Sequence, residues 1–152
     1  MITELFYNWP IRMTNDFNQA QSTIVLSTLH YVAPEKKQLT NFYHLHTALC
    51  AAGDRGLDVM VLMAQPSRRH PATSSNIRAA NALADHNILT KFVPQSHLMH
   101  AKTAVIDNSI LWVGSGNMTP AAAHHNFEVF TRTESTDLAL EFDEWLKLVE
   151  TK

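Results

Sequence analysis

Short apolar runs alternate with amphipathic stretches along most of this chain. Runs rich in β-branched residues, such as STIVLSTL at 22–29, are typical of strands, whereas apolar residues three and four positions apart indicate helices. Leu39, Phe42, Leu45 and Leu49 follow the second pattern. The predicted strands are 22–29, 57–63, 88–93, 99–106, 110–114 and 127–132. The predicted helices are 37–52, a segment from Ser74 or Ser75 as N-cap to about Asp85, and 136–149.

The order of these elements is strand, helix, strand, helix and then a meander of strands. This order predicts an α/β sandwich with a mixed sheet. The chain has 152 residues, of which 45% are hydrophobic and 17% are charged, and we find no linker or internal repeat. These values indicate a single folded domain over residues 1–152 with a core of ordinary size.

The formal charge of -2 is unevenly distributed. Residues 1–133 hold ten Lys and Arg against eight Asp and Glu, whereas residues 134–152 hold two against six. The body therefore carries about +2 and the tail about -4. This balance excludes a strongly basic nucleic-acid coat protein, but it leaves room for a local anion site.

The cysteine content and the N-terminal segment indicate the cellular compartment of the protein. Cys50 is the only cysteine, so an intramolecular disulfide is excluded. The opening MITELFYNWPIR has neither a basic region nor a long apolar run, so we expect no signal peptide. No apolar stretch approaches the roughly 20 residues that span a bilayer. We therefore expect a cytoplasmic protein that has no membrane association.

The candidate chemistry is concentrated in HLMHAKTAVIDNSILWVGSGNMT, residues 97–119. Side chains two positions apart share one face of a strand, so His100 and Lys102 are expected to project together. Asn108 suits the left-handed backbone of a tight turn between the two strands of this segment. A hairpin would then return the residues after the second strand to the His100 end.

Those returning residues are Gly-Ser-Gly-Asn, and the glycines allow a tight turn close to a ligand. The hydroxyl of Ser115 and the carboxamide of Asn117 would meet an imidazole and an ammonium. This set suits a phosphoryl group. Lys102 would offset its charge, the hydroxyl and amide would donate hydrogen bonds, and His100 would attack or transfer protons.

The spacing of these residues resembles the HKD signature of the phospholipase D superfamily. The matching pattern is His100-x-Lys102-x4-Asp107-x6-Gly114-Ser115-x-Asn117. Asn126 and Glu128 further resemble the Asn-x-Glu that follows the motif in that family. The chain looks most similar to the small bacterial endonucleases that carry a single HKD motif, over nearly its whole length. Its departures from them are the acidic tail and, relative to the periplasmic members, the expected lack of a signal peptide.

The resemblance implies a phospholipase D-like α/β sandwich with helices on both faces of the sheet, and a metal-free, two-step phosphodiester transfer. His100 would form a phosphohistidine while a second copy protonates the leaving oxygen, so the resemblance implies a homodimer. It also implies that Lys102 and Asn117 bind the non-bridging oxygens, with Ser115 in support. Glu128 would hold the other ring nitrogen of His100.

Three residues in or near this set are assigned a role from their position in the predicted elements. Asp107 lies at the hairpin turn, and we interpret it as fixing the turn rather than touching substrate. Arg68 and Arg69 follow the second predicted strand. Such loops line ligand crevices in α/β sheets, so these arginines are candidates for binding a substrate phosphate, although a solvated turn is the simpler interpretation.

The nine histidines also raise the possibility of a metal site. His44 and His46 lie about 200° apart on a helix and cannot share one ion. His97, His124 and His125 lack a carboxylate or cysteine at ligand spacing. The sequence therefore predicts neither a metal site nor a cofactor.

The expected function is a metal-independent phosphodiesterase, with DNA or RNA as the preferred substrate. One alternative is a phospholipase D or transphosphatidylase, which shares the chemistry. We expect such an enzyme to have an apolar amphipathic lid or a basic membrane face, and the sequence indicates neither. A second alternative is an inactive nucleic-acid-binding module of the same fold. The intact His100 and Lys102 argue against that alternative.

Overall fold

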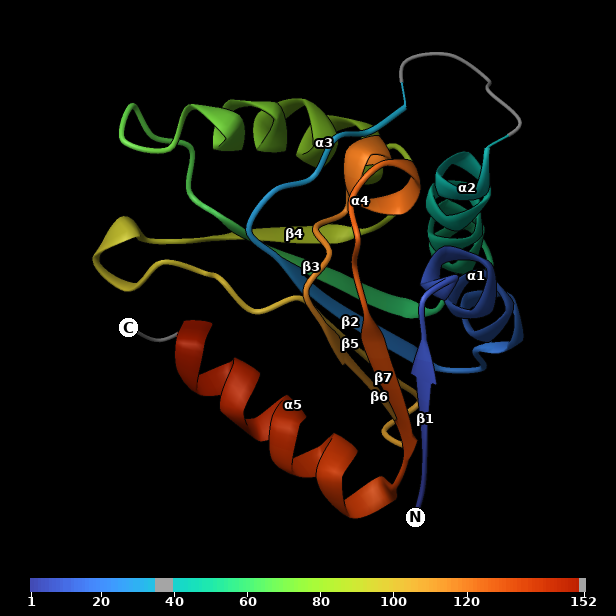
Figure 1. The fold of residues 1–152 in the computed structure, drawn as a ribbon. Helices are drawn as coiled ribbons and strands as arrows, with labels where there is room; N and C mark the ends of the chain where they lie inside the picture. The colour runs from blue at the N-terminus through green and yellow to red at the C-terminus, as the bar shows by residue number, and fades with distance from the viewer. Residues whose placement is uncertain (35–39, 151–152) are drawn as a thin grey trace.

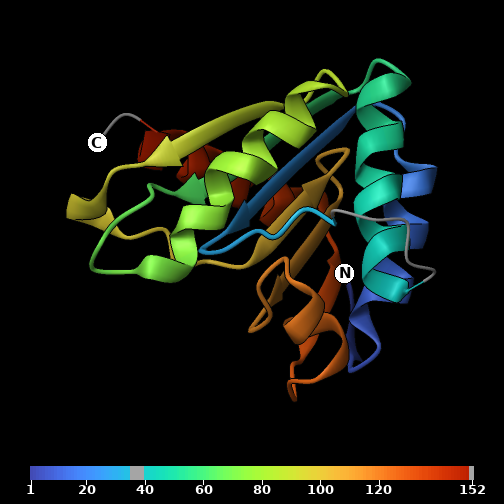
Figure 2. The same ribbon diagram turned by 90° about the horizontal axis from the view of Figure 1, so that it is seen from above.

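The computed structural model describes residues 1–34 and 40–150 of the chain. It contains a seven-stranded sheet with helices on both faces (Figures 1 and 2). The strands are β1 (Ile2–Phe6), β2 (Thr23–Thr28), β3 (Asp58–Ala64), β4 (Leu89–Val93), β5 (Thr103–Ile106), β6 (Ile110–Gly114) and β7 (Phe130–Glu134). The helices are α1 (Trp9–Gln19), α2 (Asn41–Asp54), α3 (Ser75–Ala84), α4 (Pro120–His124) and α5 (Thr136–Glu150), with short 3-10 turns η1 (Pro71–Ser74) and η2 (Gln95–His97).

The sheet is mixed, and its strand order is β1-β7-β6-β5-β2-β3-β4. Strands β2, β3 and β4 are parallel, whereas β5, β6, β7 and β1 follow as antiparallel neighbours. The predicted α/β class with a mixed sheet and helices on both faces is therefore confirmed. No helix in the described part of the chain is long and apolar enough to cross a membrane.

Two apolar cores lie on the two faces of the sheet. The larger core unites α1, α2, α3 and α4 with one face, and Trp9, Phe17 and Trp112 are among its fully buried side chains. The smaller core holds α5 against the other face through Ala139 and Leu146. In Figure 2 the sheet separates α5 from α1, α2 and α3.

Several predicted boundaries need correction. The helix predicted at 37–52 begins at Asn41, and residues 37–39 of that prediction lie outside the described residues. The strand predicted at 99–106 begins at Thr103, so His100 and Lys102 precede it. The strand predicted at 127–132 begins at Phe130, where pairing with β6 and β1 starts. No element had been predicted for β1, α1 or α4.

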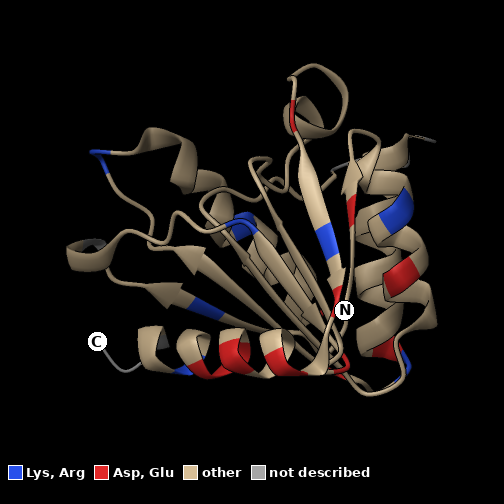
Figure 3. Ribbon diagram, turned by 60° about the horizontal axis from the view of Figure 1, so that its bottom comes forward, with Lys and Arg blue, Asp and Glu red and all other residues tan. Residues whose placement is uncertain are grey.

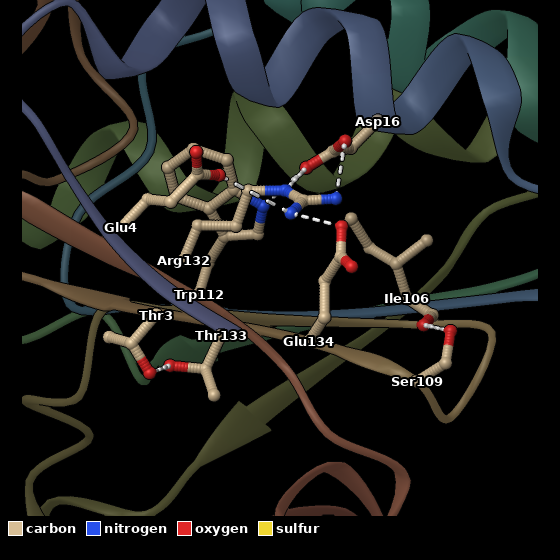
Figure 4. A network of polar contacts seen from close by, with 9 residues as sticks. All are labelled: Thr3, Glu4, Asp16, Ile106, Ser109, Trp112, Arg132, Thr133 and Glu134. Atoms are coloured by element: carbon tan, nitrogen blue, oxygen red, sulfur yellow. Dashed lines mark hydrogen bonds and ion pairs between the residues drawn. The ribbon is translucent and has the colours of Figure 1, made fainter. Parts of the chain in front are cut away.

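A buried ion pair joins α1 to β7 beneath the N-terminal strand (Figure 4). The carboxylate of Asp16 accepts hydrogen bonds from Arg132 Nε at 2.7 Å and from the indole Nε1 of Trp112 at 2.8 Å. The guanidinium also contacts Glu134 at 2.6 Å and Glu4 at 3.8 Å. Because Asp16 and Arg132 are each only 3% exposed, this network fixes the position of α1 from within the core.

Candidate active site

The predicted site residues gather at one edge of the sheet because of the strand directions. Strand β2 ends at this edge, β5 begins beside it, and β6 ends where β7 begins, with Gly114 paired to Phe130. His100 and Lys102 directly precede β5, and Ser115 and Asn117 directly follow β6. Glu128 precedes β7. The β5–β6 hairpin therefore returns Ser115 and Asn117 to the His100 end, as predicted.

The pair of His100 and Lys102 is in direct contact although neither residue is in a strand. Lys102 Nζ lies 3.2 Å from His100 Nδ1 and donates to the His100 carbonyl oxygen at 2.6 Å. The lysine carbonyl accepts from Gly114 N at 3.0 Å, so the backbone pairing of the hairpin continues one step beyond β5. The imidazole is exposed, whereas Lys102 is only 7% exposed.

The lysine charge is held in a partly dry environment. Burial lowers the pKa of Lys102, while the nearby Glu128 carboxylate acts in the opposite direction and raises it. An ammonium with few competing waters binds an anion more strongly than an exposed one. Lys102 is thus suited to hold a phosphate oxygen close to His100.

Glu128 forms the second cluster of the site. Its carboxylate accepts hydrogen bonds from the Ser115 hydroxyl and from Asn126 Nδ2, the latter at 3.0 Å. The expected contact to His100 is not among the hydrogen bonds of the described residues, since the Nδ1 atom of that ring faces Lys102 instead. The charge of Glu128 raises the pKa of Lys102, so the Glu128 cluster and the His100–Lys102 pair are electrostatically coupled.

The carboxamide of Asn117 is oriented by a residue that the sequence did not single out. Thr28 is fully buried at the end of β2, and its hydroxyl lies 3.3 Å from Asn117 Oδ1 and 3.3 Å from Met118 N. The same hydroxyl also donates to the His30 carbonyl oxygen at 3.1 Å, so its single hydrogen is shared between that carbonyl and the Asn117 carboxamide oxygen. The Nδ2 group of Asn117 remains the donor available to a ligand. The only sequence signal was a hydroxyl at the end of a predicted strand.

Asp107 lies at the opposite end of β5 from His100. Its carboxylate accepts from the backbone amides of Gln21, Ser22 and Thr23 at 2.8–3.0 Å. Burial raises the pKa of Asp107, but the hydrogen bonds from Thr23, Gln21 and Ser22 outweigh it and the net pKa is lowered. Asp107 and Asn108 both have positive φ, 49° and 50°, which matches the predicted tight hairpin. These contacts attach the turn to the start of β2 and give Asp107 a structural position.

Arg68 and Arg69 are exposed on the loop that follows β3. Because β3 is parallel to β2, this loop leaves the sheet at the same edge as the His100 cluster. Within the described residues, no hydrogen bond or ion pair joins these arginine side chains to the His100 cluster. Their role in binding a substrate phosphate stays a prediction.

The described residues contain no group of three or more His, Cys, Asp or Glu side chains placed to hold a metal ion. His46 instead lies in the core, with Nδ1 2.9 Å from the Tyr31 hydroxyl and Nε2 3.6 Å from the Cys50 sulfur. Burial, with a smaller contribution from His86, lowers the pKa of His46 to about 4. We therefore expect this ring to be neutral and structural.

The chain matches a known protein family and a curated sequence relative. A family model described as "Cardiolipin synthase, PLD-like domain" matches residues 13–149. Cardiolipin synthase A from Pseudomonas fluorescens is 28% identical over 138 residues, which cover 87% of this chain and 28% of that protein. The chain thus spans under a third of the length of this curated relative.

Two solved structures match the chain over nearly their full lengths. The phospholipase D family member Nuc from Salmonella typhimurium has a TM-score of 0.77 at 23% identity, covering 96% of this chain and 91% of that one. NucT from Helicobacter pylori has a TM-score of 0.72 at 15% identity, covering 97% and 94%. These likenesses establish a shared fold and a shared domain size.

Proposed function

The chain belongs to the cardiolipin synthase, PLD-like domain family, and on this premise we propose that it is a metal-independent phosphodiesterase acting on DNA or RNA. The observation that carries the proposal is the contact between exposed His100 and buried Lys102 at the sheet edge where Asn117 and Glu128 also lie. A nucleophile, a cation and a hydrogen-bond donor beside one another suit a phosphodiester and its developing charge.

The proposed reaction has two displacement steps. In the first, Nε2 of one His100 attacks phosphorus, and the bond from phosphorus to the leaving oxygen breaks as His100 of the partner subunit donates a proton to that oxygen. In the second, the partner histidine takes a proton from water, whose oxygen attacks phosphorus and releases the first ring. Lys102 and Asn117 would hold the non-bridging oxygens throughout.

The two histidines need different protonation patterns. A lysine ammonium has only donors, so Nδ1 of His100 is the acceptor in the observed contact and the neutral ring carries its proton on Nε2. That form cannot attack through Nε2. The attacking histidine must therefore exchange Lys102 for an acceptor at Nδ1, and we propose that a Glu128 carboxylate supplies it in the assembled site.

We propose a homodimer because the chain supplies one His-x-Lys pair and the reaction uses two histidines. A two-fold axis beside the site would bring the second copy without any further residue. Exposed apolar side chains next to the polar clusters support an interface there. They are Leu98, Val113, Phe127 and Val129, of which Phe127 is fully exposed.

Nucleic acid is the proposed substrate because the single motif resembles that of the small endonucleases, and because Nuc and NucT match this chain as whole domains of similar length. A phospholipid substrate is the second candidate. It is favoured by the sequence relative, a cardiolipin synthase, although this chain spans only 28% of that protein. The nucleic acid and the phospholipid would react by the same proposed chemistry, and they differ in the groups attached to the phosphate.

A substrate panel with excess EDTA tests the proposal. We expect cleavage of labelled single- or double-stranded DNA or RNA to continue at an undiminished rate, since histidines rather than a metal-bound water would carry the displacement. Phosphatidylcholine and phosphatidylglycerol vesicles should be cleaved far more slowly. Activity that disappears with chelator and returns with one divalent ion would refute the mechanism, and rapid cleavage of vesicles alone would favour the lipid candidate.

The variant Glu128→Gln tests the role of that carboxylate. Glutamine keeps hydrogen-bonding groups for Ser115 and Asn126 but removes the charge, so we expect kcat to fall by about 100-fold with a smaller change in KM. Glu128 raises the pKa of Lys102, so its loss should lower that pKa further. The pH profile of kcat should be bell-shaped, since one His100 must be neutral and its partner protonated. Because Lys102 must also stay charged to hold the phosphate, its lower pKa should move the alkaline limb to lower pH. Wild-type turnover with an unmoved limb would exclude both roles.

A further inference from the structure

A cavity of about 480 Å³ lies directly beside the catalytic candidate His100, which forms part of its wall. The cavity is bounded by the segment that leads from η2 to β5 and by the C-terminal half of α5. Its lining residues are His97, Leu98, Met99, His100, Ala101, Trp145 and Val149. A phosphodiester bound at His100 would therefore lie next to this cavity.

The wall is aromatic and aliphatic and contains no permanently charged side chain. Trp145 is 44% exposed, and its ring lies 5.0 Å from that of Phe142, which supports it from the same helix. The indole of Trp145 and the imidazole of His100 thus line the same cavity from two segments of the chain. A planar, uncharged group is the ligand that such a wall accommodates best.

The negative charge of α5 disfavours binding of substrate phosphates on the α5 side of the cavity. Acidic residues recur along α5 (Figure 3), and the only lysine of its described part, Lys147, already contacts Asp143 and Glu144 at 2.9 Å. A phosphate placed over α5 would be repelled by these carboxylates. The phosphate chain would instead run past Lys102, and the uncharged part of a nucleotide would turn toward Trp145.

We infer that this cavity is a nucleobase subsite, in which Trp145 stacks on the base next to the scissile phosphate. The inference rests on the proposed phosphodiesterase function and specifies its substrate as a base-bearing strand. A diacyl lipid fits less well, because Trp145, at 44% exposure, leaves the cavity wall open to water along a long acyl chain. A nucleobase can bind in a cavity that is open to water, because its polar edges can stay hydrated while one face stacks on the indole.

Cleavage of two matched substrates tests the subsite. One is a labelled single-stranded oligonucleotide, and the other is a strand of the same length in which every nucleotide is an abasic tetrahydrofuran unit. Trp145→Leu should lower kcat/KM for the first about tenfold and leave the second unchanged, whereas Trp145→Phe should retain most of the activity. Leu140→Ala, an equally exposed position on α5 outside the cavity, should change neither rate.

Intrinsic fluorescence gives a second readout that does not need turnover. Trp9 and Trp112 are buried, so quenching by a ligand reports on Trp145. In a His100→Ala background the base-bearing strand should quench this emission, and the abasic strand should not. Quenching without cleavage in the wild type would support the subsite while removing the proposed function.

Several results would overturn the subsite. These are equal loss on both strands in Trp145→Leu, equal rates on both strands in the wild type, or quenching by short-chain phosphatidylglycerol but not by the oligonucleotide. Dissociation of the Trp145→Leu variant in sedimentation would also overturn it, because the cavity would then be covered by a second copy of the chain. Cleavage of the abasic strand by wild-type protein would still support the phosphodiesterase.

Discussion

Replacing Asp16 by alanine is expected to lower the free energy of unfolding by about 3–5 kcal/mol. The carboxylate is the partner of a buried guanidinium, with Arg132 Nε at 2.7 Å, and of the buried indole Nε1 of Trp112 at 2.8 Å. Its removal leaves a charged donor and a neutral donor inside the core without their main acceptor. Urea unfolding followed by circular dichroism would measure the loss.

Control variants separate the buried contact from charge in general. Glu134→Gln alters an exposed partner of the same guanidinium and should have a far smaller effect than Asp16→Ala. The double variant Asp16→Leu with Arg132→Met removes both charges and should recover part of the loss. Recovery should be incomplete until Trp112→Phe also removes the unpaired indole donor. An Asp16→Ala protein as stable as the wild type would show that the ion pair contributes no net stability.

The candidate site was predictable because its information is local. His100, Lys102, Ser115 and Asn117 fall within 18 residues of sequence, and one hairpin suffices to bring them together. The Asp107–Asn108 turn has its own signal, since both residues tolerate the left-handed backbone found there. Short-range patterns in the sequence were therefore enough to locate the candidate site.

Features that depend on distant pairing were not predicted. Strand β1 is almost wholly exposed, so it lacks the alternation that marks a half-buried strand, and its partner Glu134 lies 132 residues from Ile2. The contact of Thr28 with Asn117 likewise depends on which strand neighbours β5. Sequence periodicity carries no information on such neighbours.

Helix α1 does carry a helical signal in the sequence. Trp9, Met13 and Phe17 recur every four residues and are all buried, and Pro10 stands in the first turn, where proline is favoured. The buried Asp16 between them obscured the stripe, because an isolated acidic residue normally indicates a solvent-facing position. Only the fold reveals that Arg132, from β7, neutralises it.

The position of Glu128 shows a further limit of the motif. The spacing predicted that this carboxylate takes part in the site, but not which atom it contacts. Within one chain it accepts from Ser115 and Asn126, while Lys102 occupies the ring nitrogen of His100. The carboxylate and imidazole that the chemistry would join are thus paired with other groups in the single chain. In the proposed dimer these pairs would have to rearrange before Glu128 could hold the ring of His100.

Mixing experiments with His100→Ala subunits should show directly whether two chains complete the site. The variant alone should lose activity by at least about 10³-fold, since it removes both the nucleophile and the acid. In a mixture of one part wild-type protein and nine parts variant, about one subunit in ten is wild type. Random exchange then leaves about one dimer in a hundred with two intact histidines. Activity should therefore fall about tenfold below the wild-type fraction.

Phe127→Ser addresses the same assembly from the interface side while leaving His100 intact. This fully exposed phenylalanine adjoins Glu128, so its loss should weaken association, and the specific activity should recover as the protein concentration rises. A substrate-binding defect would instead raise KM equally at every protein concentration. If mixed samples retain activity in proportion to their wild-type fraction, or if sedimentation shows a fully active monomer, each chain must build its own site. The second proton donor would then belong to the same chain, and single substitutions of His97, His124 and His125 would test these histidines for that role.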